Sequence, residues 1–253
     1  FLVSRADAAG AEAELEALGF RRIARTPLET TWQLADSARD PATAISVEAD
    51  DPWSLDLHYS LDVVGPPGAA TARLSALQES SRRESGPFPG ASWLGQPALL
   101  LHLAAHAGSG FHNLTLLRLV EIVLVARAGR AAGDLDWDEF LEAGRVTGSL
   151  AFAFPALALA RRLSPADIPQ AVVEKCAAQA PLAIRRLVAG MRPATAHGID
   201  RPSVREHYAW TSGAGGWLRR LAADIVPEPG SFRKSAGIHA VRARGLLRSA
   251  ARR

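Results

Sequence analysis

The stretch SLDLHYSL, residues 54–61, alternates polar and apolar side chains with a period of two. This alternation is typical of a β-strand that buries one face and leaves the other polar. The four apolar residues would face the core, and Asp56 and His58 would lie together on the opposite face. A polar face on a half-exposed sheet needs no function. The question is therefore whether Asp56 is a solvated strand residue or a metal ligand.

The residues before this strand predict a small α+β unit. Phe1–Val3 is a short apolar run, and the helical spacing of Ala11, Leu15 and Leu18 predicts a helix over residues 6–18 that stops at Gly19. Three short runs of β type follow this helix, at residues 20–25, 30–35 and 44–49. Because residues 49–52 are predicted to form a turn, Glu48 would share the polar face of the strand.

After residue 95 the period of the apolar residues becomes helical. Residues 63–95 contain proline- and glycine-rich breaks around one short helix, and glycine-rich 212–216 is predicted to be a linker. Asp136 is expected to cap a helix that has Asp138 and Glu139 in its first turn. The predicted helices are 96–107, 113–128, 136–146, 149–162, 169–179 and 182–190. The predicted fold class is α+β: a small mixed or antiparallel sheet with a covering helix, followed by an all-helical domain, with domains 1–92 and 93–253.

Composition narrows the class of protein. Hydrophobic residues make up 48% of the 253 residues, which is typical of a globular chain. Cys176 is the only cysteine, which excludes a disulfide framework and a cysteine zinc site and favours a reducing cytoplasm. The longest apolar helical stretch carries charges and is shorter than the roughly 20 residues of a membrane span. We therefore predict a cytoplasmic protein that does not bind or cross a membrane.

The basic charge lies mainly in the last third of the chain. Residues 185–253 contain 14 basic and 4 acidic side chains, whereas residues 1–95 contain 8 and 14. The final segment, 232–253, is basic and amphipathic, so we expect a surface helix there. An RNA-binding protein is therefore one alternative, although the segment lacks interleaved aromatic residues.

Two further pairs of residues are candidates for a site. His102 and His106 are four residues apart, which places them on one helix face, where two imidazoles can hold a metal or form buried contacts. Arg118 and Glu121 are three residues apart in an apolar helix, and are either a partly buried ion pair or substrate contacts. Asp56 alone cannot hold a divalent ion tightly, because hard cations need several oxygen ligands.

Several stretches together resemble a known family. They are FLVSRADAAGAEAELEALGF (1–20), WSLDLHYSL (53–61), LLLHLAAHAGSGFHNLTLLRLVEIVLVARAG (99–129) and LDWDEFLEAGRVTG (135–148). The chain resembles the bacterial uncharacterised nucleotidyltransferase family, distant members of the DNA polymerase β-like nucleotidyltransferase superfamily. The likeness covers most of residues 1–160.

The resemblance implies roles for several residues. In such proteins an Asp-x-Asp pair ends an early strand, just before apolar residues like Phe1–Val3, and a later strand supplies a third carboxylate. LDLH assigns this role to Asp56 and puts His58 beside it. The three acids would hold Mg2+ (or Mn2+), which bridges the nucleotide phosphates. The candidate substrate-binding residues are His106, which matches the family's histidine-rich segment, Arg118, and Glu121, which stands where the family tends to have aspartate.

The resemblance implies metal-dependent transfer of a nucleotidyl group from a nucleoside triphosphate to an acceptor hydroxyl. The acceptor is a small molecule, a peptide or protein, or RNA. The Asp-x-Asp pair would lie upstream of Phe1, so the alternative is a catalytically inactive binding or scaffold protein in a biosynthetic or toxin–antitoxin-like system. We also expect the Asp56 carboxylate to face a cleft between the two domains, close to the strand that contains Phe1–Val3.

Overall fold

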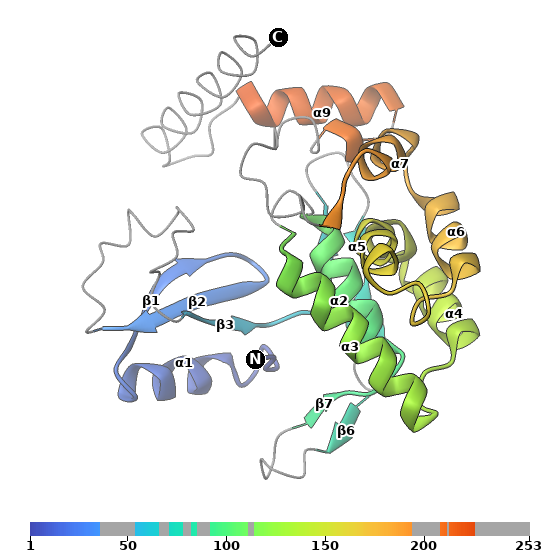
Figure 1. The fold of residues 1–253 in the computed structure, drawn as a ribbon. Helices are drawn as coiled ribbons and strands as arrows, with labels where there is room; N and C mark the ends of the chain where they lie inside the picture. Colours follow the sequence, from blue (N-terminus) through green and yellow to red (C-terminus); the bar gives the residue numbers. More distant parts are fainter. Residues whose placement is uncertain are drawn as a thin grey trace. The chain divides into compact units, whose positions relative to one another are not determined.

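The structure is a computed structural model that describes residues 1–35, 54–65, 71–77, 82–84, 92–110, 114–193, 208–211 and 213–225. The chain forms two compact units, one of residues Phe1–Asp62 and one that begins at Val63 (Figure 1). The expected division into a domain of residues 1–92 and a domain of residues 93–253 remains a prediction. The strand expected at 44–49, its Glu48, and the basic segment 232–253 lie outside the described residues.

The first unit contains a small antiparallel sheet. Its strands β1 (Phe20–Arg25), β2 (Glu29–Leu34) and β3 (Ser54–His58) pair in the order β1-β2-β3. An isolated parallel bridge joins Leu2 to His58, so the N-terminal segment lies beside β3. A small sheet with a helix, followed by a mostly helical region, confirms the predicted α+β class.

The helix α1 (Ala8–Ala17) packs on one face of this sheet. The core of the unit consists of buried Leu15, Trp32 and Leu57. Each of these large side chains contributes roughly 1.5–3 kcal/mol by leaving water. The helix stops where predicted, because Gly19 has a φ of 85°, a left-handed conformation that a residue without a side chain adopts easily.

Short strands occupy the region where the sequence predicts only breaks and one helix. The strand β4 (Val63–Val64) pairs with β5 (Thr71–Ala72), and β6 (Arg82–Glu84) pairs with β7 (Ser92–Leu94), both antiparallel. The one short helix is the 3-10 turn η1 (Leu74–Leu77). Strands of two or three residues show no measurable period, so the sequence pattern does not reveal them.

The second unit is mostly helical, as predicted. Its helices are α2 (Ala98–Ser109), α3 (Leu116–Ala132), α4 (Trp137–Thr147), α5 (Leu150–Leu163), α6 (Gln170–Gln179), α7 (Leu182–Ala189) and α9 (Gly213–Ile225) (Figure 1). The helix α5 lies at the centre and packs against α2, α3, α6 and α7. In the part of the chain that the structure describes, no helix combines the length and apolarity that crossing a bilayer requires.

Two local predictions in this unit have different outcomes. Asp136 caps α4, since its side chain accepts hydrogen bonds from the backbone of Asp138 and Glu139, as expected. The linker predicted at 212–216 is wrong, because α9 begins at Gly213. Tyr208 packs on Trp217 of this helix with ring centroids 4.5 Å apart, a tertiary contact that the glycine-rich sequence does not reveal.

Candidate functional site

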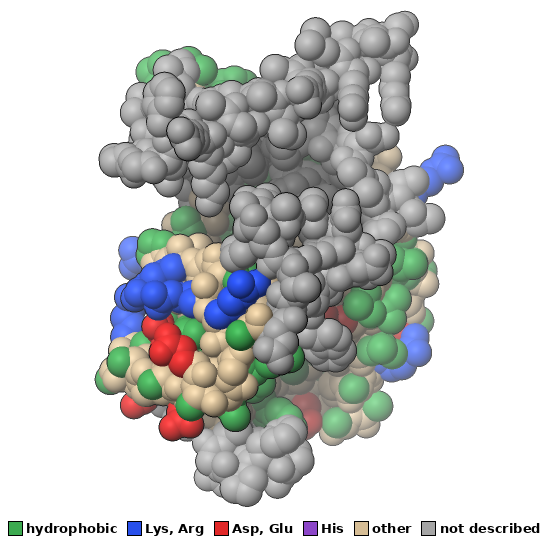
Figure 2. Space-filling view, turned by 90° about the vertical axis from the view of Figure 1, so that its left-hand side faces the viewer, with side chains coloured by type: hydrophobic (Ala, Val, Ile, Leu, Met, Phe, Trp, Pro, Cys, Tyr) green, Lys and Arg blue, Asp and Glu red, His purple; other side chains and the backbone are tan. Residues whose placement is uncertain are grey.

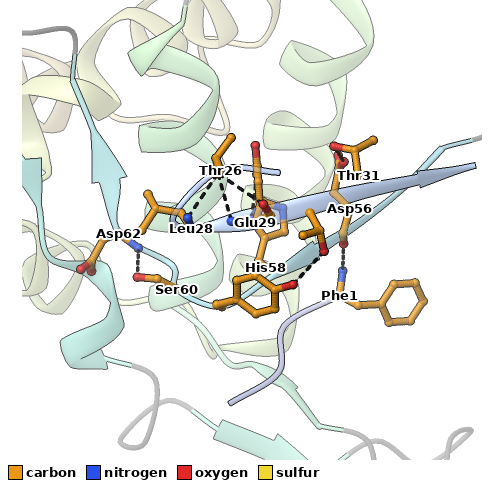
Figure 3. A network of polar contacts seen from close by, with 11 residues as sticks. Phe1, Thr26, Leu28, Glu29, Thr31, Asp56, His58, Ser60 and Asp62 are labelled. Carbon is orange, nitrogen blue, oxygen red and sulfur yellow. Dashed lines mark hydrogen bonds and ion pairs between the residues drawn. The ribbon is translucent and has the colours of Figure 1, made fainter. Parts of the chain in front are cut away.

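Asp56 and His58 lie on the polar face of β3, opposite two residues of β2 (Figure 3). The antiparallel register pairs Asp56 with Thr31 and His58 with Glu29. Leu57, which lies between them in the sequence, is 3% exposed and points into the core under α1. The alternation in the sequence therefore corresponds to a real division between a core face and a polar face.

Each of the two candidates contacts its cross-strand partner. The Thr31 hydroxyl donates a hydrogen bond to Asp56 Oδ1 at 2.8 Å. His58 Nδ1 lies 3.1 Å from Glu29 Oε2, and the two side chains are 27% and 34% exposed. These contacts restrain the Asp56 carboxylate and the His58 ring at a surface that solvent reaches.

Glu29 and Thr31 were not recognised from the sequence as part of this site. Glu29 and Thr31 are two positions apart on β2, so the sequence predicts that they share a face. Which residues of β3 lie opposite them depends on the register between the two strands, which the sequence does not show. A turn at Thr26 positions Glu29, since the Thr26 hydroxyl accepts hydrogen bonds from the backbone N–H groups of Leu28 and Glu29 at 3.2 and 3.1 Å (Figure 3). A polar residue two or three positions before a strand is the only local signal of this arrangement.

The N-terminal segment continues the sheet next to Asp56. The Phe1 amino group donates to the Asp56 carbonyl at 2.9 Å, and the His58 N–H donates to the Phe1 carbonyl at 2.7 Å. The Val3 N–H then donates to the His58 carbonyl at 2.9 Å. These three bonds form a parallel ladder in which Phe1 is opposite Leu57 and Leu2 is opposite His58.

A second polar network holds the core side of the same sheet to α1. The Tyr59 hydroxyl donates to Glu12, and Arg22 forms an ion pair with Glu12 at 2.8 Å. Thr30 lies 2.8 Å from the Tyr59 hydroxyl and accepts a hydrogen bond from Trp32 Nε1 at 2.9 Å. Burial, with the neighbouring Glu12 carboxylate, raises the pKa of Tyr59. The network fixes β3 relative to α1 and so stabilises the strand that carries Asp56.

The described residues do not make a complete magnesium site by themselves. Magnesium requires near-octahedral oxygen coordination, usually with one or two carboxylates and several waters or phosphates. Across the described ranges, no group of three or more His, Cys, Asp or Glu side chains is placed to hold a metal ion. Asp56 is a suitable single ligand, because its carboxylate is exposed and only one of its oxygens accepts the Thr31 bond.

The histidine pair on α2 lies on one helix face, as the spacing predicts. The rings of His102 and His106 are stacked with centroids 5.8 Å apart and an interplanar angle of 28°. The His106 side chain is exposed, whereas His102 is half-buried. Since no third ligand stands near them in the described part of the chain, the pair does not form a metal centre there.

Arg118 and Glu121 form an ion pair with each other on α3. Arg118 Nη1 lies 2.8 Å from Glu121 Oε2, and the two side chains are 54% and 38% exposed. The pair lies at the surface, which corrects the expectation of a partly buried pair that joins the helix to the core. Exposed pairs of this kind contribute little to stability, because water and salt screen the attraction between the two charges.

Charges of both signs lie next to one another on the surface. Figure 2 shows basic side chains gathered in one area of the face in view, with acidic side chains bordering them. The basic excess of residues 185–253 is the feature on which the RNA-binding alternative rests, and most of that segment lies outside the described residues.

Comparison with known proteins agrees with the resemblance in the sequence. The model of a family described as "uncharacterised nucleotidyltransferase" matches residues 1–165. The match includes β3 with Asp56 and His58, α2 with His106, and α3 with Arg118 and Glu121. Searches among curated proteins and among solved structures find no significant match. On the strength of the family match, the chain belongs to the uncharacterised nucleotidyltransferase family.

Proposed function

We propose that the protein transfers a nucleotidyl group from a nucleoside triphosphate to an acceptor hydroxyl with the help of Mg2+ or Mn2+, and that Asp56 is one metal-binding carboxylate. The acceptor is a small molecule, a peptide or protein, or RNA. Membership of the nucleotidyltransferase family supports the reaction class. The single buried Cys176 thiol suits a reducing cytoplasm, which is the location that we propose.

The register of the N-terminal segment is the observation that carries this proposal. Phe1 is opposite Leu57 in a parallel ladder, so a residue placed before Phe1 in the same ladder would be opposite Asp56. Neighbouring residues of parallel strands lie about 4.8 Å apart and point to the same face. The resemblance expects the second aspartate of an Asp-x-Asp pair at that position. Two carboxylates side by side repel each other unless a cation lies between them.

The other residues have defined parts in the proposal. When bound, the metal ion would stabilise the charge that develops on the transferred phosphate. Thr31 orients the Asp56 carboxylate, and Glu29 orients His58, which we place in the catalytic site beside Asp56. We keep His106, Arg118 and Glu121 as substrate-binding residues. Arg118 would exchange its surface contact with Glu121 for a phosphate, a stronger partner for a guanidinium.

The test compares the protein expressed from its full reading frame with its Asp56→Asn variant. Transfer is followed by pyrophosphate release and by incorporation of label from each α-labelled nucleoside triphosphate, with Mg2+ present. We expect Asp56→Asn to abolish transfer and to leave the circular dichroism spectrum unchanged, because the side chain is exposed and nearly isosteric. Glu14→Gln, an exposed acid of α1, is the matched control and should keep full activity.

The possible results distinguish an active nucleotidyltransferase from an inactive binding protein. Loss of transfer only in Asp56→Asn supports the proposal. Full activity of Asp56→Asn would contradict the proposal and would show that Asp56 is an ordinary polar residue on the solvent-exposed face of a sheet. If the full-length protein binds nucleoside triphosphate but transfers nothing to any class of acceptor, the inactive binding or scaffold protein becomes the better description.

A further inference from the structure

A pocket of about 450 Å³ lies between α5, α6 and α7, within the second unit. Phe154, Ala158, Val173, Ala177 and Val188 supply an apolar lining. Four of them are at least nine-tenths buried, with exposed fractions of 7, 9, 7 and 1% for Phe154, Ala158, Val173 and Val188. Pockets of this size and lining hold small organic ligands in other proteins.

Three arginines line the same pocket: Arg161 and Arg162 from the last turn of α5, and Arg185 from α7. Arg161 Nη1 donates to the carbonyls of Pro165, at 2.6 Å, and Ile168, and its Nε donates to Gln170 Oε1 at 2.7 Å. These bonds hold the guanidinium in place before any ligand arrives.

Arg162 is held in a similar way, and Arg185 is not. Arg162 donates to the carbonyls of Val188, at 3.1 Å, and Met191, at the C-terminal end of α7. The Arg185 side chain is exposed, and among the described residues no hydrogen bond or ion pair joins its guanidinium to another residue. Arg161 and Arg162 therefore supply a fixed positive field, and Arg185 supplies a guanidinium that is available to a ligand.

The described residues that line the pocket carry more positive than negative charge. Among the described residues, none of the three arginines forms an ion pair with a carboxylate. The side-chain partners of Arg161 and Arg162 are carbonyls and Gln170. Among the described residues that line the pocket, Glu174 is the only acidic one, and it accepts a hydrogen bond from Gln170 Nε2 at 2.9 Å. The three positive charges and one negative charge of these described lining residues leave a balance of +2. By contrast, Arg127 on α3 is paired with Asp167 at 2.8 Å.

We propose that this pocket binds a phosphate monoester with an apolar, preferably aromatic, body. A phosphate monoester carries a charge of about −1.5 to −2 near neutral pH, which matches the local balance. Guanidinium groups donate parallel hydrogen bonds to phosphate oxygens. The apolar lining would take the organic part. This proposal does not rest on the proposed nucleotidyl transfer, and two of the helices that line the pocket, α6 and α7, lie beyond the residues that match the family.

Isothermal titration calorimetry of the full chain with 1-naphthyl phosphate tests this site. We expect binding that weakens with added salt, and weaker binding of inorganic phosphate, 1-naphthol and 1-naphthoate, each of which lacks the apolar body or the dianionic head. Arg185→Gln should weaken binding of 1-naphthyl phosphate about tenfold, the effect of one charge-assisted hydrogen bond. Arg186→Gln, the adjacent exposed arginine outside the lining, is the matched control and should bind like the wild type.

A second pair of variants tests the apolar part. Ala177→Phe should fill the pocket and abolish binding, while Ala178→Phe, an exposed neighbour on α6 outside the lining, should not. The proposal is wrong if the wild type does not bind 1-naphthyl phosphate at millimolar concentration, or if Arg185→Gln and Arg186→Gln bind equally. Equal affinity for 1-naphthoate would overturn the assignment of a phosphate.

Discussion

At the scale of single residues, Cys176 is an inert thiol. Its side chain on α6 has no exposed surface, and burial raises the pKa of the thiol to about 12. The thiolate is the reactive form of cysteine. In the folded protein little thiolate forms at Cys176, and reagents cannot reach the buried sulfur.

We predict that Cys176 does not react with Ellman's reagent at pH 8 until the protein unfolds in urea. Since the chain has one cysteine, absorbance at the end of the titration reports this residue alone. Complete labelling of the native protein within the dead time of mixing would show that α6 opens readily, and the packing described above would then be wrong.

Asp167 is a buried carboxylate held by arginine. Arg127 donates to it from Nε and Nη2 at 3.1 and 2.8 Å, and the Ser164 hydroxyl donates at 2.6 Å. The Arg127 hydrogen bonds, followed by that of Ser164, lower the pKa of Asp167 below its ordinary value. A carboxyl with a lowered folded-state pKa stabilises the fold above its unfolded pKa of about 3.9, and this contribution is lost as the pH falls towards the folded pKa.

We predict that Asp167→Asn lowers the free energy of unfolding at pH 7 by roughly 1–3 kcal/mol, the contribution of hydrogen bonds to a charged group. The difference from the wild type should shrink as the pH falls below about 4, where the wild type loses the same contribution. Urea denaturation at several pH values measures both effects. Asp134→Asn is the control, because Asp134 is exposed and its carboxylate makes no such contact with a described residue. A difference that stayed constant with pH would exclude the charge as the cause.

At the scale of elements, the contact between α2 and α5 depends on Gly108. A Cβ atom added there would lie 1.9 Å from the carbonyl oxygen of Phe152, so the two helices would have to separate. Gly10 in α1 is the opposite case, since an added Cβ meets nothing within 4 Å.

We therefore predict opposite effects of the same substitution at these two glycines. Gly108→Ala should destabilise the protein, by about 1–3 kcal/mol as for other overpacked cores, while Gly10→Ala should stabilise α1 by about 0.5–1 kcal/mol. Thermal unfolding followed by circular dichroism gives both values. If Gly108→Ala were as stable as the wild type, α2 and α5 could not pack as closely as the structure shows.

At the scale of the whole molecule, the chain forms two compact units with separate cores. Leu57 belongs to the first core, with Leu15 and Trp32, and Ile184 is fully buried in the second unit. Separate cores allow the two units to lose their structure at different denaturant concentrations.

We predict that Leu57→Ala destabilises the first unit by about 2–5 kcal/mol, the range for truncation of a buried leucine, without changing the urea midpoint at which Cys176 becomes reactive. Ile184→Ala should lower the urea midpoint at which Cys176 becomes reactive, because Ile184 and Cys176 belong to the same unit. The far-UV signal of Leu57→Ala should then show two transitions. An equal shift of the Cys176 midpoint in both variants would show that the protein unfolds as one cooperative unit.

The sequence alone determined the features that depend on near neighbours along the chain. The helical periods placed α2 to α7 within a few residues of their bounds, and Asp136 was recognised as the cap of α4. Alternation in residues 54–61 put Asp56 and His58 on one face. A period of 2 or 3.6 residues follows from the backbone geometry of each element, and no distant contact is needed to produce it.

The tertiary structure decided which of these faces meet. The pairing of β2 with β3 brings Glu29 to His58 and Thr31 to Asp56, and shifting the register by one residue would separate both pairs. The three arginines of the pocket come together only because α5 and α7 pack side by side. Such contacts join residues that are tens of positions apart, and they are selected by the burial of the whole core, which no local stretch of sequence specifies.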